Sequence, residues 1–368
     1  MKNTVGMIVI GSFKFGGAER MAINIGEELR RNGFDIHYAL QKPIFEIPNT
    51  IDPNKIHLLS KTTGGHKLLF HLRNVIGVFA LRMRLKPQFV IGFTYFSSFL
   101  SCFTLSPRVL GRFDINPYVP NKKNRKLRTR IGTFVAKWPF VRKIIVPSYG
   151  LGNELKKMNP TFDKKIAVIH NSIDFQQIET LGRAENPLGK SIPKPYISAM
   201  GRLTHQKNYD LLLRAYARST ISQRMNLVII GDGNLKAPLM ATVHELSLKD
   251  KVNFAGFLSN PFPVIKDSEF FINSSDFESF CNVILEALCL MTPVIASDCP
   301  FGPSEIIVSG RNGLMFEPNN EGELTSILDR IDSGEIDLSL LRGKGIDSVK
   351  RFELGKIGME WVKLLENV

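Results

Sequence analysis

The chain repeatedly places a short apolar run, a glycine-rich turn and a helix-patterned segment in that order. It begins with VGMIVIG and the turn SFKFGG, after which Met21, Ile25 and Leu29 recur at helical spacing until Gly33. The run FDIHYAL follows as a second strand. Alternation of this kind places parallel strands in one sheet with helices on both faces, so the pattern predicts an α/β chain with doubly wound sheets.

A change in composition near the middle divides the chain. With 368 residues, it is long for a single core and sufficient for two domains. The segment LGRAENPLGKSIPKP is rich in proline and glycine, as linkers are. We therefore predict a first domain over residues 1–185, a second over 186–350 and a closing helix within 351–368.

Composition excludes several other classes. Hydrophobic residues make up 43% of the chain, which indicates a globular protein, and its four cysteines form no C-x-x-C pair, which favours a reduced, cytosolic compartment. The first residues resemble a β-strand more than a secretory signal. The uncharged stretch 87–107 raises the question of a membrane span, but its polar residues and flanking prolines favour the buried strand FVIGF followed by an apolar helix.

The net charge of +14 is unevenly distributed. Residues 1–185 hold 29 Lys and Arg against 12 Asp and Glu, a net +17, which leaves −3 for the remainder. No helix-turn-helix, ribonucleoprotein or zinc-finger pattern accompanies the charge, so nucleic acid is not an expected partner. A basic first domain instead suits an anionic membrane surface or an acceptor that carries pyrophosphate.

The basic charge is densest in residues 115–153, which contain nine Lys or Arg and no acid. The segment is either a solvated basic face or a surface that binds an anionic membrane, and the sequence leaves both interpretations open. In the second interpretation aromatic side chains approach the lipid beside the basic ones. The residues concerned are Lys122, Lys123, Arg125, Lys126, Arg128 and Arg130, with Phe134, Trp138 and Phe140.

The segment 276–298, DFESFCNVILEALCLMTPVIASD, is the most informative part of the second half. It predicts a loop with Glu278, a helix with Glu286 and a buried strand. Glu278 then lies beside a helix N-terminus, whose free N–H groups and dipole suit a phosphate. The spacing E-x7-E alone is also compatible with a loop charge and a solvated helix residue.

Two further turns follow predicted strands of the second half, at the edge of an open α/β sheet where ligands bind. After PYISAM comes GRLTHQKN, in which Arg202 offers a fork of donors and Lys207 a point charge for phosphates. After NLVII comes a turn that begins at Gly231 and suits the close approach of a nucleotide base.

Taken together, these motifs resemble the retaining glycosyltransferases of family 4, which have the GT-B architecture. The matching strings are GGAER, HNSID, GRLTHQKN and the E-x7-E segment. The resemblance implies two Rossmann-like domains facing across a cleft, with the C-terminal helix returning to the first domain. It implies catalytic roles for Arg202, Lys207 and Glu278. It implies donor-binding roles for Gly16, Gly17, Gly201, Asn208, Gly231, Phe257, Asn282, Val283 and Glu286.

The resemblance also implies the reaction. A monosaccharide, hexose or N-acetylhexosamine, would pass from a nucleotide sugar, UDP rather than GDP, to a lipid-linked or cell-surface glycan of O-antigen, capsule or lipopolysaccharide type. Glu286 would hold the ribose and Glu278 the transferred sugar. The enzyme would work at the inner face of the cytoplasmic membrane. The chain departs from many relatives in one respect, because near Asp114 and Asn116 it lacks their first-domain histidine.

No D-x-D motif occurs, so we expect neither a metal nor another cofactor, and neutralisation of the diphosphate by side chains and a helix dipole. Two alternatives remain: a UDP-sugar 2-epimerase of the same architecture, and a non-catalytic protein that binds sugar nucleotides. A basic first domain disfavours the epimerase, and the intact motif residues disfavour the non-catalytic protein.

Overall fold

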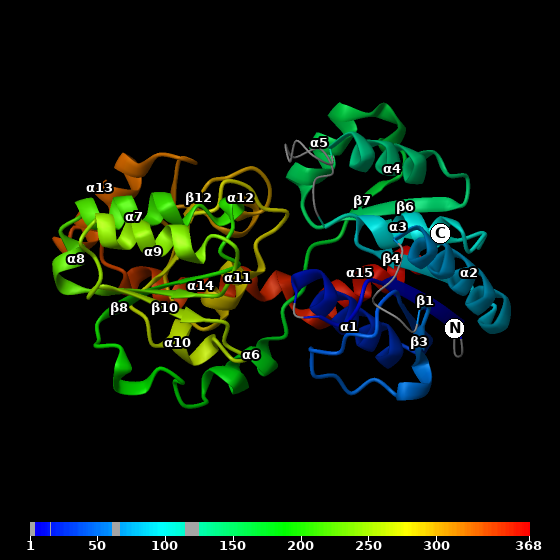
Figure 1. Ribbon diagram of the computed structural model, residues 1–368, viewed down its shortest axis with the longest axis horizontal. Helices are drawn as coiled ribbons and strands as arrows, with labels where there is room; N and C mark the ends of the chain where they lie inside the picture. Colours follow the sequence, from blue (N-terminus) through cyan, green and yellow to red (C-terminus); the bar gives the residue numbers. More distant parts are fainter. Residues whose placement is uncertain (1–3, 15, 61–66, 115–124) are drawn as a thin grey trace. The chain divides into compact units, whose positions relative to one another are not determined.

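The computed structural model describes residues 4–14, 16–60, 67–114 and 125–368. It divides into two compact units, Met1–Ser172 with Leu354–Val368, and Ile173–Glu353 (Figure 1). Each unit has a parallel sheet between helices, so the predicted fold class of two Rossmann-like units is confirmed.

Unit 1 contains a seven-stranded sheet in the order β3-β2-β1-β4-β5-β6-β7. Its strands are β1 Thr4–Ile10, β2 Phe34–Leu40, β3 Ile56–Leu58, β4 Phe89–Phe93, β5 Val109–Arg112, β6 Val141–Val146 and β7 Ile166–Val168. Its helices are α1 Gly17–Arg31, α2 Lys67–Leu85, α3 Tyr95–Cys102, α4 Arg125–Lys137, α5 Tyr149–Met158 and α15 Leu354–Glu366.

The two faces of this sheet form separate cores because side chains alternate along β1. Ile8 and Ile10 pack on the side of α1 and α15, whereas Met7 and Val9 pack on the side of α2 and α3. Helices therefore cover both faces, as the alternation of apolar runs predicted.

Unit 2 contains a six-stranded sheet in the order β10-β9-β8-β11-β12-β13. Its strands are β8 Tyr196–Met200, β9 Asn226–Ile230, β10 Val252–Gly256, β11 Phe271–Asn273, β12 Val294–Ser297 and β13 Leu314–Phe316. Its helices are α6 Phe175–Gly182, α7 Tyr209–Arg218, α8 Ile221–Arg224, α9 Lys236–Glu245, α10 Phe262–Lys266, α11 Asn282–Cys289, α12 Pro303–Ile306, α13 Glu321–Asp332 and α14 Ser339–Val349.

The chain leaves unit 1 earlier than the expected boundary at residue 185, between Ser172 and Ile173. The reason is α6, which contacts α10 and α11, and whose Ile178 belongs to the apolar core of unit 2. The chain returns at Leu354, close to the expected residue 351.

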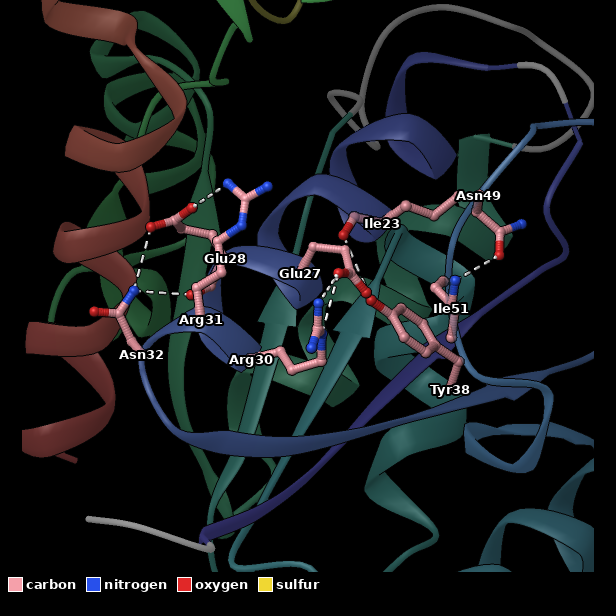
Figure 2. A network of polar contacts seen from close by, with 9 residues as sticks. All are labelled: Ile23, Glu27, Glu28, Arg30, Arg31, Asn32, Tyr38, Asn49 and Ile51. Atoms are coloured by element: carbon pink, nitrogen blue, oxygen red, sulfur yellow. Dashed lines mark hydrogen bonds and ion pairs between the residues drawn. The ribbon is translucent and has the colours of Figure 1, made fainter.

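The C-terminal helix α15 packs against α1 within unit 1. Gly358 is required at this contact, because a Cβ atom there would lie 2.0 Å from Cγ of Glu28. Around the last turns of α1, Glu27 accepts from Arg30 at 2.9 Å, and Glu28 accepts from Arg31 at 3.3 Å (Figure 2). The contact with α1 confirms the predicted return of the helix to the first domain.

No helix in the described part of the chain is long and apolar enough to cross a membrane. The uncharged stretch that raised this question forms β4 and the short helix α3, as predicted. All four cysteines are buried and unpaired.

The basic segment at residues 115–153 is only partly described. Lys122, Lys123 and Asn116 lie outside the described residues, and α4 begins at Arg125. Two aromatic residues of the segment lie in an aromatic cluster, which leaves both interpretations of the segment open. Phe134 packs against Phe99, Phe103 and Trp138, with ring centroids 5.3, 6.4 and 5.1 Å away. Phe134 and Trp138 are partly exposed within this cluster, and Phe140 is exposed.

Two histidines form a polar pair where β2 and β3 lie side by side. Nδ1 of His37 lies 2.9 Å from Nε2 of His57, and the rings stack. Burial is the largest cause that lowers the pKa of His37 below its ordinary value, and the positive charge of Lys55 is the second. Burial and then the charge of His37 lower the pKa of His57 to about 4. Both rings are therefore held neutral in the folded chain at neutral pH.

We expect unit 1 to lose stability as the pH falls from about 6.5 to about 4. Above this window, neither state binds protons at these rings. Within it the unfolded chain takes up protons that the folded chain excludes. Urea unfolding followed by tryptophan fluorescence measures this effect in unit 1, because Trp138 and Trp361 both lie there.

His57→Gln should flatten the pH dependence of the urea midpoint, since glutamine carries no charge in either state. His244→Gln, an exposed position on α9, is the matched control and should keep the wild-type slope. An unchanged slope in His57→Gln would contradict the proposed origin of the pH dependence.

Candidate functional site

The strand order of unit 2 changes direction between β8 and β11. From β8 the chain moves outward to β9 and β10, and then crosses back to β11, β12 and β13 on the other side. At such a switch point the loops after the two central strands diverge and leave a crevice at the carboxyl edge of the sheet, where α/β folds bind ligands. Here those loops are residues 201–208 and 274–281.

The two loops are joined by hydrogen bonds. The Gln206 side chain donates to the carbonyl of Phe277 at 2.9 Å, and the Asp276 amide donates to the carbonyl of Gln206 at 2.9 Å. The Asn208 side chain donates to Oδ1 of Asp276 at 2.6 Å. Asn208 also has a left-handed backbone, with φ 44°, and caps α7. The motif asparagine therefore connects the loops at a turn that few other residues adopt without strain.

An ion pair between Lys207 and Glu278 lies at the centre of this connection. The two atoms Nζ and Oε1 are 2.5 Å apart, and the side chains are 15% and 9% exposed. Burial alone would lower the pKa of Lys207, but the charge of Glu278 outweighs it and raises the pKa above its ordinary value. Oε1 also accepts from the Ser275 hydroxyl at 2.8 Å. Lys207 is therefore held charged inside the site.

Both partners keep unused hydrogen-bonding capacity. A lysine ammonium has three donors, and Glu278 takes one of those of Lys207. Oε2 of Glu278 accepts no hydrogen bond from the described residues. The pair can thus offer further donors and an acceptor to a ligand without coming apart.

Arg202 lies on the same loop, immediately after β8 and Gly201. It is exposed, and its guanidinium makes no hydrogen bond or ion pair with the described residues. Arg202 is the free cation of the loop, whereas Lys207 is the paired one.

The glycines of this edge allow neighbouring loops to approach closely. A Cβ atom on Gly231, whose φ is 134°, would lie 2.1 Å from the carbonyl oxygen of Gly201. One on Gly201 would lie 2.8 Å from Cε of Lys207. We expected Gly231 to admit a nucleotide base. Instead, glycine is needed at this position because another loop of the protein packs against it.

Helix α11 follows the second loop and starts after Cys281, whose φ is 75°. Asn282 and Val283 are its first residues, both partly buried, and Glu286 is buried one turn further on. The order predicted from sequence is therefore confirmed: Glu278 precedes the helix and Glu286 lies inside it.

Three predicted donor residues make none of these contacts between the two loops. Phe257 is exposed on the loop after β10, and β9 lies between that strand and β8. Gly16 caps α1 in unit 1 with extended backbone, and Gly17 is the first residue of that helix. No described contact of Gly16 or Gly17 assigns them to a ligand.

Sequence reasoning missed the contacts that Asp276 and Ser274 make with Asn208 and Lys207, because they lie about 70 residues from these partners. It also missed a polar cluster in unit 1. Nε of Arg112, a fully buried side chain at the end of β5, donates to Asp114 at 2.7 Å, and Nη2 donates to Asn171. The only local signal was a basic residue and an acid closely following an apolar strand.

Comparison with known families accounts for both units. Residues 15–177 match the model named Glycosyltransferase Family 4, and residues 183–339 match the model named Glycosyl transferases group 1. The chain belongs to the family 4 glycosyltransferases. Its two Rossmann-like units have the GT-B fold of that family.

Two curated relatives come from Campylobacter jejuni. The chain is 33% identical over 202 residues to N-acetylgalactosamine-N,N'-diacetylbacillosaminyl-diphospho-undecaprenol 4-alpha-N-acetylgalactosaminyltransferase, which covers 55% of this chain and 54% of the relative. It is 24% identical over 372 residues to a second N-acetyl-D-galactosaminyltransferase, whose name gives a glycan on PP-undecaprenol as acceptor, with 98% of each chain covered. The first curated relatives are matched over about half their length.

A solved structure confirms the fold over the whole chain. Anabaena Alr3699/HepE in complex with UDP and glucose aligns with a TM-score of 0.81 at 16% identity. The alignment covers 99% of this chain and 100% of that one.

Proposed function

We propose that this family 4 member is a retaining glycosyltransferase that transfers one monosaccharide from a nucleoside diphosphate sugar to a lipid-linked or cell-surface glycan. The observation that carries the proposal is the Lys207–Glu278 pair at the switch point of unit 2, with the free Arg202 on the same loop. A hexose or N-acetylhexosamine from a UDP donor fits best, since the names of the relatives include galactosaminyl transfer, a diphospho-undecaprenol acceptor and UDP.

In this proposal the basic and acidic residues of the two loops have different roles. Negative charge grows on the leaving diphosphate as the sugar bond breaks. Arg202 and the remaining donors of Lys207 stabilise that charge in place, without reorganising when the reaction occurs. Glu278 keeps Lys207 oriented through Oε1 and offers Oε2 to a hydroxyl of the transferred sugar.

The start of α11 and its buried acid complete the donor site. The N–H groups of Asn282 and Val283 lie in the first turn of the helix, where the dipole favours an anion. Glu286 on the next turn would hold the ribose hydroxyls. The Arg202 and Lys207 charges take the place of a metal, so we propose no cofactor.

The proposed location of the acceptor at a membrane is supported by the net positive charge of the first half of the chain. A net +17 over residues 1–185 favours a place at the inner, anionic face of the cytoplasmic membrane, where lipid-linked glycans are presented. No nucleic acid is proposed as a partner.

A screen of nucleotide sugars by thermal shift, made in excess EDTA, tests this function. A matching UDP-sugar at about a hundredfold over its Kd should stabilise the protein by about 2.7 kcal/mol. The same donor should support transfer to a polyprenyl-diphosphate glycan with the chelator present. Binding without transfer would favour the non-catalytic alternative, release of a free epimer would favour the 2-epimerase, and activity that returns only with Mg²⁺ or Mn²⁺ would refute the metal-free mechanism.

A further inference from the structure

Helix α2 of unit 1 carries apolar residues on two opposite faces. Val78 and Leu81 are buried against β1, β4 and α3 in the core on one side of the sheet. Gly77 allows the close approach, since a Cβ atom there would lie 2.9 Å from the carbonyl oxygen of Leu59. This inward face is sufficient to hold the helix on the sheet.

The outward face of α2 is also apolar, and it is exposed. At the helical angle of about 100° per residue, five large side chains fall within one narrow arc roughly opposite the buried face. They are between 41% and 70% exposed. The members of this outer stripe are Leu68, Leu72, Ile76, Phe79 and Met83. A contiguous exposed apolar stripe of this kind marks an interaction surface.

Positive charge surrounds the outer stripe. Arg73, Arg82 and Arg84 lie on α2 itself, which has no acidic residue. From residue 53 to residue 153 the single acid is Asp114, and it is paired with Arg112 in the interior. The helix that carries the stripe is therefore basic, with no acidic residue of its own.

This charge decides between the two occupants that an apolar face could take. A second copy of the chain, packed stripe to stripe, would bring like charges together, which opposes association. An anionic bilayer complements both features of this helix. Its negative headgroups attract the arginines, and its apolar interior accepts the outer stripe. An apolar face bordered by arginines is typical of helices that lie in the plane of a membrane interface.

We propose that α2 is the membrane-docking helix of this protein, with the outer stripe inserted between the headgroups of an anionic lipid surface. The inference rests on the proposed function for the presence of a lipid-borne acceptor, and it deepens that function by naming the surface that meets the lipid. It differs from the basic segment at residues 115–153, where Phe134 and Trp138 are engaged in an aromatic cluster.

A polarity-sensitive dye placed on the stripe tests the insertion directly. The native cysteines are buried, so Ile76→Cys in the full chain provides a single accessible thiol. With vesicles of equal parts phosphatidylglycerol and phosphatidylcholine, the dye emission should shift to the blue. The matched control is Leu340→Cys on α14 of unit 2, whose side chain is 63% exposed, and its emission should not shift. No shift at Ile76, or the same shift at both positions, would overturn the proposal.

Sedimentation measures what the stripe contributes to binding. Leu68→Gln, Leu72→Gln and Ile76→Gln combined keep the net charge and the helix propensity, and should lower partitioning onto anionic vesicles at least tenfold. Leu340→Gln with Met240→Gln, two exposed positions of unit 2, should leave it unchanged. Equal partitioning of the triple variant and the wild type would refute the insertion. A wild-type dimer that the triple variant converts to a monomer would assign the stripe to a second copy and also overturn it.

The donor thermal shift separates this inference from the proposed function. The triple variant leaves the loops of unit 2 untouched, so the stabilisation by a UDP-sugar should match that of the wild type. Loss of vesicle binding with the donor shift retained supports the docking helix. If the wild type binds vesicles normally but no UDP-sugar raises its thermal stability, the proposed function is refuted. The assignment of α2 as the docking helix is then still supported.

Discussion

Arg202→Ala and Lys207→Ala are each expected to lower kcat by roughly a hundredfold or more. In the proposed reaction, both substitutions remove a positive charge that is needed more as the diphosphate departs than when the donor first binds. The two variants differ in their effect on the fold. Arg202 is exposed and unpaired among the described residues, so its replacement should leave the unfolding temperature nearly unchanged. Loss of Lys207 leaves the carboxylate of Glu278 buried without its counter-ion and should destabilise unit 2.

Steady-state kinetics combined with thermal unfolding checks this prediction. Lys249→Ala, an exposed lysine in the turn before β10 at the opposite edge of the sheet, removes the same charge and should keep the wild-type kcat. Full turnover by Arg202→Ala would remove that residue from the donor site. If the activity of Lys207→Ala fell only with its folded fraction, Lys207 would be a structural residue.

The fold was largely predictable because its strands and helices are encoded locally. The helix predicted to end before Gly33 is α1, which runs to Arg31, and FVIGF and FDIHYAL match β4 and β2. The boundary between the units was not predictable in the same way. Helix α6 has an apolar face, but the core that this face joins depends on α10 and α11, far along the chain.

The candidate site was predictable only as two separate loops. The motif around Arg202 and the segment around Glu278 each suggested a ligand, yet their contact depends on the strand order that brings β8 and β11 together. Lys207 and Glu278 are 71 residues apart in sequence, so nothing local indicated that the two charges form a pair. For the same reason the sequence did not indicate that Gly231 is needed for a contact between loops.

The outer stripe of α2 shows a further limit of sequence patterns. Apolar residues on both faces of a helix predict burial on both faces, and the sequence does not say which face meets the sheet. Only the structure shows that Val78 and Leu81 are covered and that Ile76 is not. The pattern was visible in the sequence, but its meaning depends on packing.

Arg112→Met is expected to cost unit 1 about 3 to 5 kcal/mol of unfolding free energy, a large part of the roughly 5 to 15 kcal/mol of an ordinary protein. Arg112 is fully buried, with its guanidinium over the rings of Phe93 and Trp361 at 5.4 and 5.8 Å. Methionine keeps most of the apolar contact but leaves the partly buried Asp114 without its counter-ion, whose Nε lies 2.7 Å from Oδ1 in the wild type. Asn171 also loses the hydrogen bond that Nη2 of Arg112 donates to its Oδ1.

The cause of that loss can be separated from simple loss of packing. In the cluster, Nη1 of Arg112 and Oδ2 of Asp114 have no hydrogen-bond partner among the described residues, so the pair is already incompletely satisfied. Adding Asp114→Asn to Arg112→Met removes the uncompensated charge and should recover part of the stability, as measured by the urea midpoint with an unchanged m value. Arg142→Met, an exposed arginine on the neighbouring strand β6, is the matched control and should change stability by about 0.5 kcal/mol or less. A double variant no more stable than Arg112→Met would place the cost in the lost contacts with Phe93 and Trp361, because removal of the charge would then have gained nothing.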